Sequence, residues 1–107
     1  MKIEKIDNMW RGWFIGNFEP SVLKTKSFEV GMLIHKKGEV WPKHYHLIST
    51  EYNLLIDGSM TICGELITPG TIFILEPNEI ADPIFHEDCR VLCVKVPSIP
   101  GDKYGVL

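Results

Sequence analysis

Two histidines and a carboxylate stand close together in the stretch GEVWPKHYHLISTEYNLLIDG, from Gly38 to Gly58. His44 and His46 are one residue apart, so in an extended segment both side chains lie on one face, about 6.6 Å apart. Imidazole nitrogens at that spacing can converge on one metal ion at about 2.1 Å. The next four residues let the chain reverse, and Glu51 can return at the start of the following strand. The spacing therefore predicts a three-ligand metal face.

The composition is that of one soluble globular domain. The 107 residues are 45% hydrophobic and 23% charged, with a formal net charge of -3, which argues against nucleic acid and anionic membrane as partners. No run approaches the roughly 20 apolar residues of a spanning helix, and the N-terminus lacks the apolar run of a signal peptide, so we expect a cytoplasmic protein. The three cysteines are an odd number and are expected to be reduced.

Short runs of β-forming residues alternate with turn residues, and no helix of ordinary length is expected. The pattern favours an all-β barrel or sandwich with one domain over 1–107. We expect an N-terminal arm (1–27), a barrel core (28–96) and a C-terminal tail (97–107). The strands expected in the core are 28–35, 40–46 with a late start caused by Pro42, 51–57, 59–63, 66–68, 71–75, 84–86 and 90–96.

The central stretch resembles the first motif of the cupin superfamily, G-x5-H-x-H-x(3,4)-E-x6-G. Gly38, His44, His46, Glu51 and Gly58 satisfy every fixed position. The resemblance implies an all-β cupin-type double-stranded β-helix, or jelly-roll, barrel. It also implies that His44, His46 and Glu51 are ligands of a divalent metal ion, because they are ligands in the metal-binding members; Fe, Mn, Ni and Zn are the candidates.

The second cupin motif, G-x5-P-x-G-x2-H-x3-N, matches less well. Its first glycine aligns with Gly70, but Ala81 occupies the position of the fourth metal ligand. Asp82 can replace that ligand if the chain bulges before Pro83, and His86 is a more distant alternative. Without either, two histidines and one carboxylate form the ligand set of a facial triad, with open coordination positions.

Further residues are expected around the metal face. Asn53 and Leu55 share the face of Glu51 in an extended strand and are candidates for second-shell support and for the pocket wall. Small cupin barrels often pair, so a homodimer is expected, and the aromatic N-terminal residues Trp10 and Trp13 are candidates for the contact. Packing in the core is the other interpretation of these aromatics.

The residues permit more than one function and do not decide whether the protein is an enzyme. The leading hypothesis is a small cupin that binds a small molecule at a metal in the barrel, as a metal-dependent oxygenase or isomerase would. The first alternative is a metal-free isomerase or epimerase of sugars or sugar nucleotides, with a pocket histidine as general base. The second alternative is a non-catalytic module that binds a small ligand.

Overall fold

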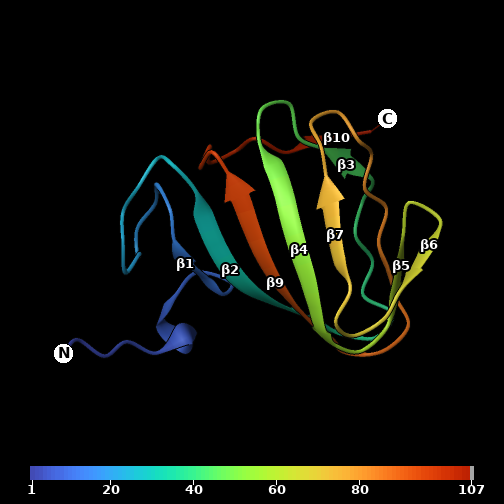
Figure 1. Ribbon diagram of the computed structural model, residues 1–107, viewed down its shortest axis with the longest axis horizontal. Helices are drawn as coiled ribbons and strands as arrows, with labels where there is room; N and C mark the ends of the chain where they lie inside the picture. The colour runs from blue at the N-terminus through green and yellow to red at the C-terminus, as the bar shows by residue number, and fades with distance from the viewer. Residues whose placement is uncertain (107) are drawn as a thin grey trace.

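The computed structural model describes residues 1–106 (Figure 1). These residues form short strands and one 3-10 helix. In chain order the elements are η1 (Ile6–Asn8), β1 (Trp13–Ile15), β2 (Glu29–His35), β3 (His44–Tyr45), β4 (Thr50–Asp57), β5 (Met60–Ile62), β6 (Glu65–Ile67), β7 (Ile72–Leu75), β8 (Ile84–Phe85), β9 (Cys89–Val96) and β10 (Tyr104–Gly105).

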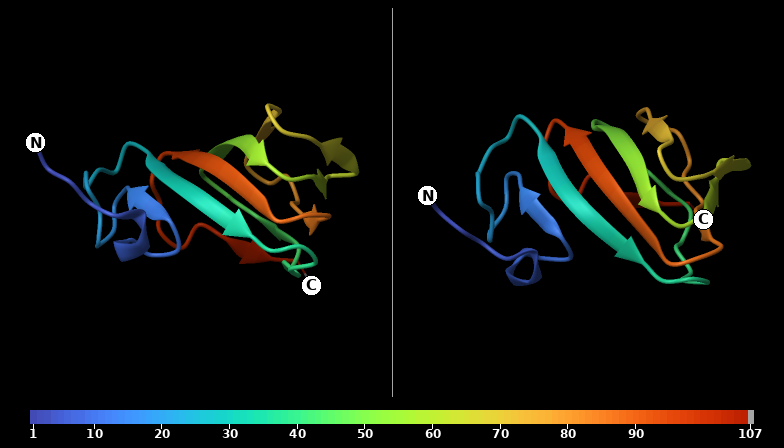
Figure 2. Two further views of the ribbon diagram at one scale, coloured as in Figure 1. Left: turned by 90° about the horizontal axis from the view of Figure 1, so that it is seen from below. Right: turned by 60° about the horizontal axis from the view of Figure 1, so that its bottom comes forward.

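Two walls, built from three sheets, enclose the interior. The larger has the strand order β1-β2-β9-β4-β7 and is antiparallel throughout. The other wall consists of the pair β10-β3 and the sheet β6-β5-β8, which isolated bridges join from Val40 to Ile84 and from His44 to Ala81. The turned views of Figure 2 show these smaller sheets next to the larger one. The architecture is the double-stranded β-helix that the sequence predicts.

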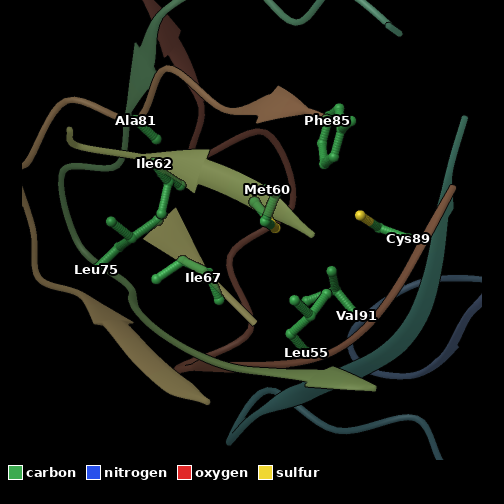
Figure 3. Packing of buried hydrophobic residues seen from close by; sticks show 9 residues of the cluster. All are labelled: Leu55, Met60, Ile62, Ile67, Leu75, Ala81, Phe85, Cys89 and Val91. Atoms are coloured by element: carbon green, nitrogen blue, oxygen red, sulfur yellow. The ribbon is translucent and has the colours of Figure 1, made fainter. Parts of the chain in front are cut away.

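Side chains of the larger sheet alternate between the interior and the outer face, as strand geometry requires. Leu33, Val91 and Leu55 are cross-strand partners on β2, β9 and β4, and Val91 and Leu55 are buried. A fully buried side chain of this kind stabilises the fold by about 1.5–3 kcal/mol. The core cluster spans both sheets (Figure 3) and consists of Leu55, Met60, Ile62, Ile67, Leu75, Ala81, Phe85, Cys89 and Val91.

The predicted core strands lie within one residue of their observed ends, with one exception. The strand expected over 40–46 is only His44–Tyr45, because Pro42 lacks the N–H group that a ladder needs. Both ends of the chain add strands to the barrel, β1 from the expected arm and β10 from the expected tail. Cys63, Cys89 and Cys93 are all free thiols, as predicted. No helix within residues 1–106 is long and apolar enough to cross a membrane.

The C-terminal segment is tied to the loop between β3 and β4. The carboxylate of Asp102, only 5% exposed, accepts hydrogen bonds from the three backbone N–H groups of residues 47–49, at 3.0, 3.1 and 2.8 Å. β10 then pairs with β3, and the N–H of Val106 donates to the carbonyl of Lys43. The loop that joins His46 to Glu51 is therefore held by a residue more than fifty positions away.

We predict that Asp102→Ala lowers the free energy of unfolding at pH 7 by about 3 kcal/mol, because buried backbone donors lose a charged acceptor. Burial alone would raise the pKa of Asp102, but the N–H groups of residues 47–49 outweigh it and lower the pKa. The stabilisation is therefore complete above about pH 4 and is lost at lower pH.

Urea unfolding of the wild type and Asp102→Ala at pH 7 and pH 3 checks this prediction, with Glu65→Ala in the exposed β5–β6 hairpin as control. The difference in the free energy of unfolding between wild type and Asp102→Ala should be smaller at pH 3 than at pH 7. If Asp102→Ala lowers this free energy at pH 7 by no more than Glu65→Ala does, the prediction is wrong.

Candidate functional site

The structure brings together the three side chains of the first motif. His44 lies in β3, Glu51 lies in β4, and His46 stands at the start of the loop between them. The two imidazole rings have centroids 5.4 Å apart, and Nε2 of His46 is 3.6 Å from Oε2 of Glu51. These residues, called the His-Glu site below, lie at the end of the interior where β4 begins.

His44 is oriented by its neighbours. Its Nδ1 is 3.1 Å from the carbonyl oxygen of Pro42, so an Nδ1–H donor there leaves the Nε2 lone pair free. Its backbone exchanges hydrogen bonds of 3.0 and 2.7 Å with Ala81 on the neighbouring strand. Ala81, where the family's fourth ligand stands, therefore faces the site as a buried methyl group.

His46 is a neutral imidazole with an unused nitrogen. The residue is 3% exposed, and its buried Nε2 has no hydrogen-bond partner within residues 1–106; the same is true of Nδ2 of Asn53. Burial, reinforced by the ammonium group of Lys95, lowers the pKa of His46. Burial also lowers the pKa of His44. An unsatisfied buried polar atom costs about 1–3 kcal/mol, so the site offers an acceptor at Nε2 of neutral His46 and a donor at Nδ2 of Asn53 that a bound group can satisfy.

A row of charged side chains crosses the larger sheet beside the His-Glu site. Glu29, Lys95 and Glu51 are direct cross-strand partners on β2, β9 and β4. Nζ of Lys95 is 3.8 Å from Oε1 of Glu29. Lys95 was not among the predicted site residues, although in RVLCVKV this lysine has the same parity as the buried Val91 and Cys93.

A second lysine reaches the site from the C-terminal segment. Nζ of Lys103 lies 3.9 Å from the ring centroid of Trp41, whose ring is 6.1 Å from that of His44. Nε1 of Trp41 donates to the carboxylate of Glu39, which also contacts Nδ1 of His35 at 2.6 Å. No local pattern could have indicated Lys103, because only the pairing of β10 with β3 brings it here.

The two proposed replacements for the fourth ligand contact β5 and its turn instead. Oδ1 of Asp82 accepts a hydrogen bond of 3.3 Å from the backbone of Cys63, and Asp82 lines a groove of about 340 Å³ beside Trp41. The exposed His86 places Nε2 at 2.7 Å from Oγ1 of Thr61. The other predicted neighbours, Asn53 and Leu55, share the inward face of Glu51 as expected.

The donor types of the His-Glu site suit a divalent metal, but their arrangement does not. Within residues 1–106 no group of three or more His, Cys, Asp or Glu side chains is placed to hold a metal ion. Ala81 supplies no ligand, and after burial the positive charge of Lys95 contributes to the lowered pKa of His46. As they stand, these residues do not fit a bound metal cation.

Comparisons with known proteins give structural matches alone. No family model and no curated protein matches the sequence. An uncharacterised protein from Klebsiella pneumoniae with a double-stranded β-helix domain is 18% identical, with a TM-score of 0.71 over 98% of this chain and 91% of that one. An RmlC-like cupin from Ralstonia eutropha is 13% identical, with a TM-score of 0.60 over 78% and 58%.

A variant of Streptomyces PAC13 with uridine is also similar, at 13% identity and a TM-score of 0.64 over 77% of this chain and 69% of that one. At such identities the likeness concerns the fold. The two facing sheets, the complete first motif on β3 and β4, and these neighbours agree with one another. The chain has the cupin fold.

Proposed function

We propose that this protein binds a small polar organic molecule directly at the His-Glu site, without a metal ion between them. The observation that carries this proposal is the buried Nε2 of His46, which has no partner within residues 1–106. It is 3.6 Å from the Glu51 carboxylate, too far for a good hydrogen bond between them. A structural histidine would normally have its polar atoms satisfied.

The geometry favours a ligand with adjacent hydroxyl groups. Neutral His46 offers an acceptor nitrogen when its proton is on Nδ1, and Glu51 offers acceptor oxygens next to it. Two acceptors this close match two neighbouring donors, such as the vicinal hydroxyls of a sugar. A PAC13 variant with the same fold holds uridine, which supports a sugar-containing ligand here.

The same pair of residues gives the site a route to acid–base chemistry. A neutral imidazole that accepts a hydrogen bond from a ligand hydroxyl can also accept its proton, and burial keeps the pKa of His46 low enough for the neutral form at pH 7. Of the reactions predicted from the sequence, a metal-free isomerase or epimerase of sugars or sugar nucleotides fits best. The non-catalytic module would use the same contacts for binding alone.

We predict that His46→Leu removes ligand binding while leaving the free protein as stable as the wild type, or more stable. Leucine is close in size to the buried imidazole and has no polar atom to leave unsatisfied. Removing an unsatisfied buried polar atom relieves a cost of about 1–3 kcal/mol in the free energy of unfolding. Thermal unfolding gives the stability. Calorimetric titration with monosaccharides, nucleosides and nucleotide sugars, uridine included, gives the binding.

The matched control for His46→Leu is Met60→Leu, which keeps core volume and alters no polar atom. It should retain binding of any molecule that the wild type binds. Strong destabilisation by His46→Leu, or unchanged binding in that variant, would show that His46 is structural.

A divalent metal at His44, His46 and Glu51 is the second candidate. The carbonyl of Pro42 orients His44 through Nδ1, as outer-shell carbonyls orient metal-binding histidines. A bound ion would polarise a ligand oxygen as a Lewis acid. Asp82 would have to leave its hydrogen bond with Cys63 in order to join the other three.

We expect elemental analysis of protein purified without added metal to find far less than one ion per chain. Fe(II), Mn, Ni and Zn should each leave the melting temperature unchanged, because the lysines oppose a cation and Ala81 leaves one ligand position empty. One equivalent of metal that is lost in His44→Ala would instead establish the metal site and overturn the direct-binding proposal.

The outer face of the larger sheet supports a homodimer. Its row Met32, Leu92, Leu54 and Ile72 is entirely apolar across four strands. The other members of this outer apolar face are Val30, Ile34, Tyr52, Ile56, Ile74, Val94 and Val96. Ile34 and Ile72 are 64% and 68% exposed, which is unusual for large apolar side chains grouped on one surface.

A second copy of the chain is the occupant that this face fits. Its charged residue, Arg90, is paired with Asp57, so two copies related by a twofold axis meet without repulsion. The four strands, each with up to about seven residues on this sheet, cover an area of roughly 20 by 20 Å. This area is enough for the apolar centre of an interface of about 800 Å² per partner. Trp13, a candidate for this contact or for packing in the core, packs on Gly31.

We predict a dimer of twice the 12.2 kDa chain mass by size-exclusion chromatography with light scattering. Ile72→Lys combined with Ile34→Lys should give a folded monomer, because the charges would be buried against each other. Leu66→Lys, equally exposed on the other sheet, is the control and should remain dimeric. A wild-type monomer at 100 µM, a concentration in the range of weak dimers, would refute the homodimer.

A further inference from the structure

The C-terminal segment places a positive charge at the rim of the His-Glu site. Lys103 lies between Asp102, which is fixed by the N–H groups of residues 47–49, and β10, which pairs with β3. The backbone on both sides of Lys103 is thus anchored to the strand and loop that carry His44 and His46. The lysine is held at the site by the fold, unlike a lysine on a free tail.

Among residues 1–106, the charge of Lys103 has no carboxylate partner. Within residues 1–106 no Asp or Glu lies within 4 Å of its ammonium group, whereas Lys95 has Glu29 at 3.8 Å. The contact of Lys103 is the face of Trp41, 3.9 Å away. A cation over an aromatic ring keeps most of its ability to attract an anion, because the ring supplies no negative charge. Burial and the nearby charge of Lys95 lower the pKa of Lys103, which a bound anion would counteract.

Trp41 links this charge to the His-Glu site. Its indole nitrogen is fixed by Glu39, and its ring centroid lies 3.9 Å from Nζ of Lys103 and 6.1 Å from the ring centroid of His44. Trp41 is therefore a neighbour of both the lysine and the first histidine of the site. A ligand whose hydroxyls face His46 and Glu51 can extend past His44 toward Lys103, as a sugar acid or a sugar phosphate would.

We propose that Lys103 and Trp41 form a subsite for an anionic group, a carboxylate or a phosphate, of the ligand. This inference rests on the proposed function, because the rest of that ligand lies against His46 and Glu51. The occupant is then a small hydroxylated acid or phosphate ester. The ammonium group supplies a compact charge that suits oxygen anions of either kind.

The test is an NMR titration of ¹⁵N-labelled protein with inorganic phosphate and, separately, malonate, at constant ionic strength set by NaCl. The indole N–H signal of Trp41 is the reporter. In the wild type at least one anion should shift this signal in a saturable manner, and the stronger of the two identifies the group as phosphate or carboxylate. A Trp41 signal that neither anion shifts saturably would overturn the inference.

Lys103→Met keeps the aliphatic stem on Trp41 and removes the charge, so it should raise the apparent Kd at least about ten-fold. Lys103→Arg should restore binding. Lys37→Met, which removes an equal charge from the exposed turn after β2, should bind as the wild type does. Equal binding by wild type and Lys103→Met would overturn the inference.

The two proposals fail in different ways. If neither anion binds but a neutral ligand is lost in His46→Leu, the anionic subsite is wrong and the proposed function stands. If phosphate or malonate binds through Lys103 but no molecule of the calorimetric panel needs His46, the subsite stands and the proposed function fails.

Discussion

The site depends on the capture of three backbone N–H groups by Asp102. Residues 47–49 connect the last histidine of the motif to Glu51, and a loop this short has few ways to satisfy its donors. A carboxylate from the C-terminal segment satisfies all of them at once. This one interaction fixes the loop, brings β10 against β3 and places Lys103 over Trp41. The geometry of the first motif is therefore supported by residues 102–106 of the C-terminal segment.

The interior is divided into an apolar end and a polar end. Leu55, Val91 and their neighbours supply the burial that stabilises the barrel, while Glu29, Lys95 and Glu51 lie side by side at the other end of the same strands. Buried charges require partners, and this row provides alternating signs across neighbouring strands. Within residues 1–106, Nε2 of His46 and Nδ2 of Asn53 remain unsatisfied beside this row. A stable protein tolerates an unsatisfied buried polar atom most readily where ligand binding requires that atom.

The sequence predicts the parts of this structure that are set by local pattern. Alternation in β4 places Asn53 and Leu55 on the face of Glu51, and the histidine spacing brings His44 and His46 together. What depends on long-range pairing was not predictable. Asp82 forms its bond with Cys63 because the segment before β8 is held against β3 by the bridge between Ala81 and His44. Lys103 enters the site because the two residues after it pair with β3, and a strand of two residues is too short to show an alternating pattern.

The departures from the metal-binding motif all make the site less favourable for a cation. Replacing a ligand with Ala81 removes an electron-pair donor, and Lys95 adds a positive charge next to His46. Lys103 adds another at the rim. Each change weakens the attraction of the interior for a cation. The two lysines also strengthen the attraction of the interior for an anion. The neutral histidines serve in either case as acceptors for hydroxyl groups. The first motif can thus be retained in full in a site to which residues outside the motif add two cationic side chains.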